Sequence, residues 1–273
     1  MAKDNSSCRS GVLPKAGKQD GPDATSSRRS GADPDATPFG TGRRALVTGA
    51  GSGIGRAAAL ALAQEGFEVL LVGRDSAKLA AVAEVVPSPV RIIAADIATS
   101  EGRAAIRDAV GERLDVLVNS AGQYLREPVA SLSAEAWDAL DAVNVRAPIL
   151  LSQAVLTQLK SVQGQIVFIN SSTGLVAGGQ GMAAYAAGKH ALKAAAEVLR
   201  QEVNRDGVRV LSVYPGRTDT AMQAAILAAE GRVAQAGALM RPEDVADMVV
   251  AALRLPRTAE VTDIVMRPMR PLR

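Results

Sequence analysis

From residue 44 onward, short apolar runs alternate with longer segments in which apolar residues recur at helical spacing. The short runs, such as FEVLLV at 67–72, are apolar throughout, which is typical of strands that are covered on both faces. Strands and helices that alternate with short connections predict right-handed crossovers and a doubly wound parallel α/β sheet. The runs predicted to be strands are residues 44–48, 67–72, 90–95, 114–118, 165–169, 208–213 and 261–265.

The segments between these runs predict the helices that would cover the sheet. They are residues 53–65, 76–86, 100–110, 134–161, 183–204 and 242–253. Pro148 is expected to kink the long segment 134–161, because proline removes a helical hydrogen bond. The expected fold is a single Rossmann-type doubly wound parallel sheet of about seven strands flanked by helices. In such a sheet the ligand crevice lies beyond the carboxyl ends of the strands.

Residues 1–41 have a different composition from the rest of the chain. They hold four large apolar residues among six Ser, five Gly and four Pro, too few to offset the entropy of ordering. We therefore expect a disordered tail at 1–41, carrying an inert exposed Cys8, and one domain at 42–273. The five Asp residues of the segment argue against a transit peptide and the lack of an apolar core against a secretory signal, so a cytoplasmic location is expected.

The overall composition excludes several classes of protein. With 48% hydrophobic residues and a net charge of +3, the chain is neither disordered nor strongly basic. One Cys and one His leave neither a disulfide framework nor the usual zinc site, so we expect no metal. No apolar stretch approaches the roughly 18 residues of a membrane span. Aromatic residues, at 3%, are too few to predict nucleic-acid binding.

A glycine-rich loop follows the first predicted strand and opens the first predicted helix. It reads TGAGSGIG from Thr48 to Gly55. Glycines let the backbone approach a pyrophosphate, and the N-terminus of the helix attracts the anion. An ordinary flexible turn is the alternative, but the strand–loop–helix context favours a nucleotide site.

Arg74 follows the second predicted strand, where the ribose of a dinucleotide would lie. A carboxylate at this place would bind the 2′-hydroxyl of NAD, whereas a guanidinium suits the 2′-phosphate of NADP. We therefore favour NADP(H), with NAD(H) as the alternative. Arg74 could instead be a solvated partner of Asp75, which itself could cap the following helix.

A tyrosine and a lysine stand four residues apart near the start of the helix predicted at 183–204. Tyr185 and Lys189 would share one helix face, where the ammonium would lower the pKa of the phenol toward the range of a general acid or base. Ser172 follows the preceding strand and would reach the same crevice, where its hydroxyl could donate to a substrate oxygen.

Taken together, these motifs resemble those of the short-chain dehydrogenases/reductases of the shorter-subunit branch, and the resemblance extends from residue 43 to the C-terminus. The loop fits TGxxxGxG, NSAG at 119–122 stands for NNAG, and PGRTDT at 215–220 fits PGxxxT. Ser120 and Gly188 depart from the usual Asn and Ser, and neither departure removes a reacting group.

The resemblance implies a set of site residues and a mechanism. Tyr185 would exchange a proton with the substrate oxygen, Ser172 would polarise the carbonyl, and Lys189 would hold the nicotinamide ribose. Asn144 would position a water that relays protons from Lys189. The cofactor-binding residues implied by the loop, the Arg74 argument and the resemblance are Thr48, Gly49, Gly51, Ser52, Gly53, Ile54, Gly55, Arg74, Asp96, Ile97, Asn119, Ala121, Gly122, Tyr185, Lys189, Pro215, Gly216, Thr218 and Thr220.

The expected function is NAD(P)-dependent interconversion of a carbonyl and an alcohol on a small or medium-sized molecule, in a homodimer or homotetramer. A non-catalytic NADP(H)-sensing protein is the alternative, although a sensor would not need the acid–base residues. A substrate lid is expected near 217–240, and its Ala-rich composition favours an apolar carbonyl compound. Arg126 and Arg217 could hold a substrate carboxylate, but ordinary surface arginines are the favoured interpretation.

Overall fold

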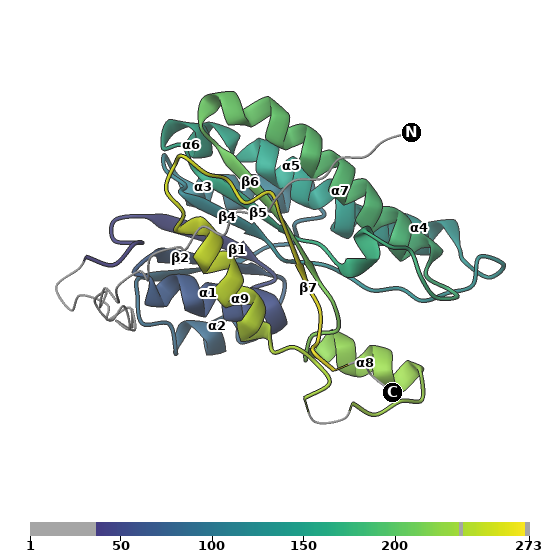
Figure 1. Cartoon of the computed structure of the whole chain (residues 1–273). Helices are drawn as coiled ribbons and strands as arrows, with labels where there is room; N and C mark the ends of the chain where they lie inside the picture. The colour runs from purple at the N-terminus through teal and green to yellow at the C-terminus, as the bar shows by residue number, and fades with distance from the viewer. Residues whose placement is uncertain (1–36, 235–236, 271–273) are drawn as a thin grey trace, which may run out of the picture. The chain divides into compact units, whose positions relative to one another are not determined.

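The computed structural model describes residues 37–234 and 237–270 and contains the predicted parallel sheet (Figure 1). Its seven strands are parallel and lie in the order β3-β2-β1-β4-β5-β6-β7. They are β1 (Arg44–Thr48), β2 (Glu68–Gly73), β3 (Val90–Ala94), β4 (Val116–Asn119), β5 (Gln165–Ile169), β6 (Arg209–Pro215) and β7 (Asp263–Met266). The fold prediction is confirmed, with strand ends that differ from the expected ones by at most two residues.

Helices cover both faces of the sheet, as Figure 1 shows. One face carries α1 (Gly53–Gln64), α2 (Ser76–Ala83) and α9 (Pro242–Leu253). The other carries α3 (Ser100–Val110), α5 (Ala147–Ala154), α6 (Leu156–Ser161) and α7 (Ala183–Val203). α4 (Ala134–Asp141) packs against α7, and α8 (Ala221–Ala229) follows β6 away from both layers.

Successive side chains of a strand enter opposite layers of the core. In β1, Ala45 and Val47 pack with α1 and α9, whereas Leu46 packs on the opposite side. All three side chains are fully buried, which explains why the strand is apolar at every position instead of alternating.

The segment predicted as one kinked helix at 134–161 is divided more finely than expected. Between α4 and α5 the backbone forms a π-helical turn, η1 (Ala142–Arg146). Pro148 lies in the first turn of α5, where it lacks the N–H that would bond to the carbonyl of Asn144. The prediction of a kink at Pro148 is thus corrected: the irregular turn lies before the proline and includes Asn144.

The domain begins before residue 42. Most of the predicted tail, with Cys8, lies outside the described residues, but residues 37–41 contact the domain. The Gly40 N–H donates to the Glu65 carbonyl at 2.7 Å, and the Phe39 ring meets Phe67 edge-on at 5.4 Å between centroids. Residues 37–41, which the composition assigned to the tail, thus pack with the domain, because Phe39 has an aromatic partner that the local composition does not reveal.

The switch in strand order lies between β1 and β4, the neighbours from which the chain winds in opposite directions. The loops that follow β1, β4, β5 and β6 meet at the carboxyl ends of the strands and line a cavity of about 390 Å³. Within the described residues, no helix has both the length and the apolar character needed to cross a bilayer.

Candidate active site

The glycine loop forms the floor of the cavity, and its shape depends on the missing side chains. Gly49 and Gly53 have φ angles of +66° and +53°, which disfavour L side chains. A Cβ on Gly55 would lie 2.3 Å from the Gly49 carbonyl oxygen, so this turn closes only with glycine. Ser52 precedes α1, but no side chain of the described residues caps the helix. The free N–H groups of α1 thus fit the pyrophosphate of a dinucleotide.

The next loop is tied to the glycine loop through Thr48. Its hydroxyl oxygen accepts hydrogen bonds from the backbone N–H groups of Ser120 and Ala121, at 3.0 and 3.1 Å. Asn119 is buried and donates to the Ser152 hydroxyl at 3.2 Å. Thr48 and Asn119 therefore shape the cavity from behind its wall.

Lys189 lies deep in the cavity, with 4% of its surface exposed. Its ammonium donates to the Ile169 carbonyl at 3.5 Å. Asn170 fixes the helix at this point, because its side-chain amide donates to the Lys189 carbonyl at 3.1 Å. A Cβ on Gly174 would come within 2.7 Å of the Asn170 side-chain oxygen, so a glycine is needed there. Asn170 thereby positions Lys189, a role that the sequence did not suggest.

Tyr185 shares the face of α7 that carries Lys189, as its spacing predicted. The ammonium nitrogen of Lys189 lies 5.8 Å from the centroid of the Tyr185 ring. On the other side, the ring of Tyr124 meets Tyr185 edge-on, with 5.1 Å between centroids. Both tyrosines line the cavity, so a substrate oxygen can reach the Tyr185 phenol.

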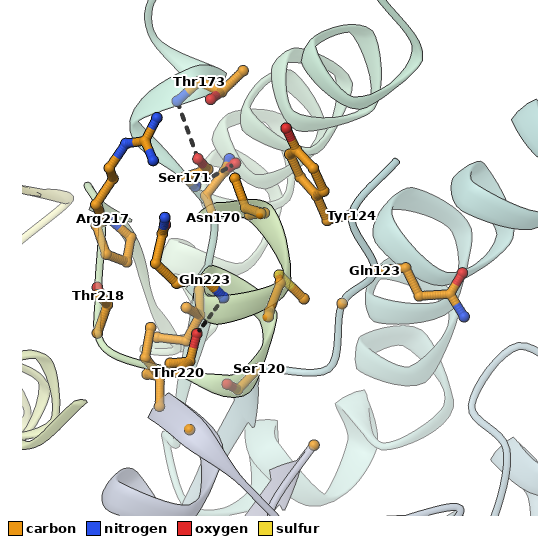
Figure 2. Close-up of a pocket in the computed structure, with 18 of the residues that line it drawn as sticks. Ser120, Gln123, Tyr124, Asn170, Ser171, Thr173, Arg217, Thr218, Thr220 and Gln223 are labelled. Carbon is orange, nitrogen blue, oxygen red and sulfur yellow. Dashed lines mark hydrogen bonds between the residues drawn. The ribbon is translucent and has the colours of Figure 1, made fainter. Parts of the chain in front are cut away.

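The hydroxyl that interacts with Tyr185 belongs to Ser171, the residue before the expected Ser172. Ser171 lies beside Asn170 in Figure 2, and its hydroxyl oxygen accepts from the Thr173 N–H at 3.1 Å. Ser172 begins a single 3-10 turn and lines the same cavity. Two neighbouring hydroxyls are thus available to a substrate, whereas the sequence pattern selected one.

Burial dominates the titration of both catalytic candidates. It raises the pKa of the Tyr185 phenol, and the interaction with Ser171 opposes this rise. It also lowers the pKa of Lys189 from 10.5 to about 8, because the ammonium loses its hydration. The expectation that Lys189 brings the pKa of Tyr185 below its usual value is not met in this structure: desolvation raises the pKa of the phenol, and Ser171, not Lys189, opposes the rise.

Asn144 stands behind the cavity wall, in the π-helical turn. Its side-chain amide donates to the Gln123 carbonyl at 2.9 Å and its side-chain oxygen accepts from the Gln123 N–H at 2.8 Å. Gly122 separates it from Lys189, since a Cβ on that glycine would lie 3.3 Å from the Asn144 oxygen and 3.9 Å from the Lys189 nitrogen. Asn144 thus holds the β4 loop next to Lys189.

The predicted cofactor residues divide into two groups. Those that line the cavity are Gly49, Ser52, Gly53, Ile54, Gly55, Ala121, Gly122, Tyr185, Lys189, Pro215, Gly216, Thr218 and Thr220. Those outside its lining are Thr48, Gly51, Arg74, Asp96, Ile97 and Asn119.

Two residues of the second group stand at the ends of β2 and β3. Arg74 is exposed beyond the end of β2. Asp75 caps α2 by accepting from the Lys78 N–H at 3.1 Å, and its carboxylate pairs with the Lys78 ammonium at 3.3 Å. Asp96 accepts from the Ala98 N–H at 2.9 Å and shapes the turn after β3. Because Asp75 pairs with Lys78, the guanidinium of Arg74 stays available to a ligand.

The cavity is also lined by polar residues outside the predicted catalytic and cofactor sets. Glu230, Gln223 and Arg217 all line the cavity. The Arg217 guanidinium donates to both carboxylate oxygens of Glu230 at 3.0 Å. Arg217 therefore is not an ordinary surface arginine, although the sequence favoured that interpretation. Gln223 and Glu230 carry no motif, and only their place on and just after α8 brings them to the cavity.

Comparison with known proteins identifies the family. The model of the short chain dehydrogenases matches residues 43–231. The chain belongs to the short-chain dehydrogenase family. This confirms the resemblance read from the glycine loop and the Tyr185–Lys189 pair.

Several members of the short-chain dehydrogenase family are similar over most of the chain. An uncharacterized oxidoreductase of Staphylococcus epidermidis is 34% identical over 230 residues, which are 82% of this chain and 96% of that protein. A metagenomic short-chain oxidoreductase in complex with NADP is 31% identical, with a TM-score of 0.72, and covers 84% of this chain and 99% of its own.

An alcohol dehydrogenase from the archaeon Thermococcus sibiricus, complexed with 5-hydroxy-NADP, is 25% identical, with a TM-score of 0.74. The similarity covers 85% of this chain and 99% of that one. These matches support an oxidoreductase that uses a nucleotide cofactor.

The buried ammonium of Lys189 gives a first prediction, on stability. A lysine titrates near 10.5 when unfolded and near 8 here, so the unfolded state holds more protons between these values and wild-type stability rises with pH across that window. At neutral pH the buried charge lowers stability, and Lys189→Met should raise the free energy of unfolding by about 3 kcal/mol. Urea titration at several pH values measures the difference, which should shrink toward pH 10.

Lys193→Met, on the same helix, is the matched control. Lys193 is half-buried and its ammonium is paired with Glu197, so its replacement should not reproduce the gain in stability expected for Lys189→Met. A Lys189→Met variant that is less stable than the wild type at neutral pH would contradict the assignment of an unfavourable buried charge.

Proposed function

We propose that this protein is an NADP(H)-dependent oxidoreductase that interconverts a carbonyl and an alcohol, with Tyr185 as the general acid and base. One observation carries the proposal: Tyr185 and Lys189 line the same cavity as the glycine loop. A single space thus offers a phosphate cradle and an acid–base pair, which is what hydride transfer to a carbonyl requires.

The cavity fits a nicotinamide dinucleotide. The uncapped N-terminus of α1 and the glycine loop would hold the pyrophosphate, and Arg74 would lie near the 2′-phosphate of the adenosine ribose. Pro215, Gly216, Thr218 and Thr220 form the wall where the nicotinamide end would lie. When bound, the cofactor supplies or accepts the hydride.

The protein's own side chains would manage the proton. In reduction, the Tyr185 hydroxyl donates its proton to the carbonyl oxygen as the hydride reaches the carbon; in oxidation, the phenolate takes the proton of the alcohol. Burial raises the pKa of Tyr185, which keeps the phenol protonated and favours its role as an acid in reduction. The hydroxyls of Ser171 and Ser172 would donate to the substrate oxygen and stabilise its developing charge.

Lys189 would have two tasks. Its ammonium would bind the ribose hydroxyls of the cofactor, and its charge would stabilise the phenolate of Tyr185. With a pKa near 8, Lys189 can also exchange a proton near neutral pH. Asn144 is the candidate that would position a water for proton exchange between Lys189 and solvent. It holds the loop after β4 through its hydrogen bonds to Gln123.

The alternative function, a non-catalytic sensor of NADP(H), would need only the phosphate end of this cavity. The buried ammonium and the phenol beside it are costly to build and would serve no purpose in such a sensor. We therefore propose the enzyme. A cytoplasmic location and a homodimer or homotetramer stay predictions.

Removal of the phenolic hydroxyl tests the acid–base assignment. Tyr185→Phe should bind NADPH as the wild type does, because the ring and Lys189 remain. Turnover of a carbonyl panel should fall by about 10²- to 10⁴-fold, the usual contribution of a general acid. Nicotinamide fluorescence measures binding, and loss of NADPH absorbance measures turnover. A variant with wild-type turnover would show that the proton comes from another group.

The choice of cofactor depends on Arg74. Replacement by Gln should weaken NADPH binding by about 10- to 100-fold, the worth of a charged hydrogen bond, and leave NADH binding unchanged. Fluorescence titration with each cofactor measures both affinities. Arg107→Gln is the matched control, because Arg107 is exposed and paired with Asp108 on α3. Tighter binding of NADH than of NADPH by the wild type would contradict the proposal.

The two serines should have separable effects. Ser171→Ala removes the interaction that lowers the pKa of Tyr185, so the pH profile of alcohol oxidation should shift upward. Ser172→Ala should lower the turnover number at every pH and leave the position of the profile unchanged. Profiles of the oxidation rate for both variants decide the matter. If the pH profile shifted upward with Ser172→Ala and not with Ser171→Ala, Ser172 would be the residue that lowers the pKa of Tyr185.

A further inference from the structure

Charged residues from three segments gather on the wall of the cavity beyond Tyr124. Glu230, just after α8, accepts from Arg217 at 3.0 Å and from Arg126, in the loop after β4, at 3.2 Å. The guanidinium of Arg232 lies 3.9 Å from the second Glu230 oxygen. We call these four residues the arginine cluster.

Two guanidinium groups of the arginine cluster, those of Arg126 and Arg217, donate to the single carboxylate of Glu230. The guanidinium of Arg217 and the other nearby arginines hold the pKa of Glu230 below its usual value, so this carboxylate is ionised at neutral pH. Of the described residues that line the cavity, Glu230 is the one carboxylate, whereas Arg217 and Lys189 both contribute cations. The cavity thus favours an anion.

Two hydrogen-bond donors on this wall are unsatisfied within the described part of the chain. The Nη1 atom of Arg217 is buried without an acceptor, although the other terminal nitrogen of the same guanidinium binds Glu230. The side-chain nitrogen of Gln223 is also without an acceptor, and Gln223 is only 7% exposed. Figure 2 shows Gln223 on the side of the cavity that also carries Arg217 and Thr220. Buried donors without acceptors are costly unless a ligand supplies one.

The arginine cluster lies near Tyr124, whose ring packs against the catalytic tyrosine. Tyr124 contacts the Tyr185 ring, and the charges of Arg126, Glu230 and Arg217 all act on the pKa of Tyr124. Met182 and Ile226 add apolar surface to the same cavity. A short aliphatic chain would therefore connect an oxygen at Tyr185 to an anion at Arg217.

We infer that the substrate carries a carboxylate, which Arg217 and Gln223 bind while its carbonyl or hydroxyl group lies at Tyr185. The substrate class is then a short oxo acid or hydroxy acid. One guanidinium nitrogen and one amide nitrogen can each donate to one carboxylate oxygen, and Glu230 would hold Arg217 in the orientation that this requires. This inference rests on the proposed carbonyl–alcohol chemistry.

The test compares oxo acids with their neutral methyl esters. The probes are pyruvate, acetoacetate and levulinate, in which the distance between carbonyl and carboxylate increases stepwise, each with NADPH. Wild type should show a kcat/KM for at least one acid that exceeds that of its ester by about 10- to 100-fold. Arg217→Gln and Gln223→Leu should each reduce the ratio of the kcat/KM for the acid to that for its ester.

Arg241→Gln is the matched control, since Arg241 is exposed, paired with Asp244 and outside the cavity lining. It should keep the acid preference. Equal turnover of acids and esters by wild type, or an acid preference that survives Arg217→Gln, would overturn the inference while leaving the proposed oxidoreductase intact.

A second measurement separates failure of the inference from failure of the proposed function. If no carbonyl compound oxidises NADPH, the proposed function fails. Thermal shift of the protein with NADPH should still show stabilisation by butyrate and not by butyramide, and Arg217→Gln should lose this effect. No difference between butyrate and butyramide would overturn the carboxylate site, whatever the turnover assays show.

Discussion

The buried ammonium of Lys189 constrains most of this site. The ammonium has lost nearly all of its water, and it donates to the Ile169 carbonyl at 3.5 Å. An ion in such surroundings stays in place only when the surrounding structure fixes it. Asn170 holds the helix backbone at Lys189, and Gly122 and Gly174 leave the space that close packing there requires. Loops from β4 and β5 therefore converge on one side chain of α7.

The N-terminus of α1 connects the fold to the chemistry in a similar way. The glycine loop leaves the N-terminus of α1 without a side-chain cap, whereas α2, α3 and α4 are capped by Asp75, Thr99 and Ser133. The chain thus leaves uncapped, at the switch point of the sheet, a helix end that could bind phosphate. Unsatisfied donors and a buried charge lower stability, and they occur where the proposed ligand would compensate them.

Much of this structure was predictable because its signals are local. Strands covered on both faces are apolar throughout, the helix caps are short polar residues before apolar segments, and Tyr185 and Lys189 share a helix face through their spacing. The π-helical turn around Asn144 was not predictable, because it depends on how Pro148 and the β4 loop fit together in space. The contact of Phe39 with Phe67 likewise joins residues that local composition treats separately. Arg126 and Glu230 are 104 positions apart, so no sequence spacing announces their ion pair. The choice between Ser171 and Ser172 depends on the path of a single 3-10 turn.

In the proposed reaction a hydride reaches a carbonyl carbon in the cavity where Tyr185 supplies the proton. NADPH deuterated at the transferable position of the nicotinamide tests it directly, with mass spectrometry of the alcohols formed from a mixture of carbonyl compounds. Deuterium is expected on the carbinol carbon of at least one product with the wild type, and it should be lost with Tyr185→Phe. Oxidation of the cofactor without deuterated alcohol, or labelling that is unchanged in Tyr185→Phe, would contradict it.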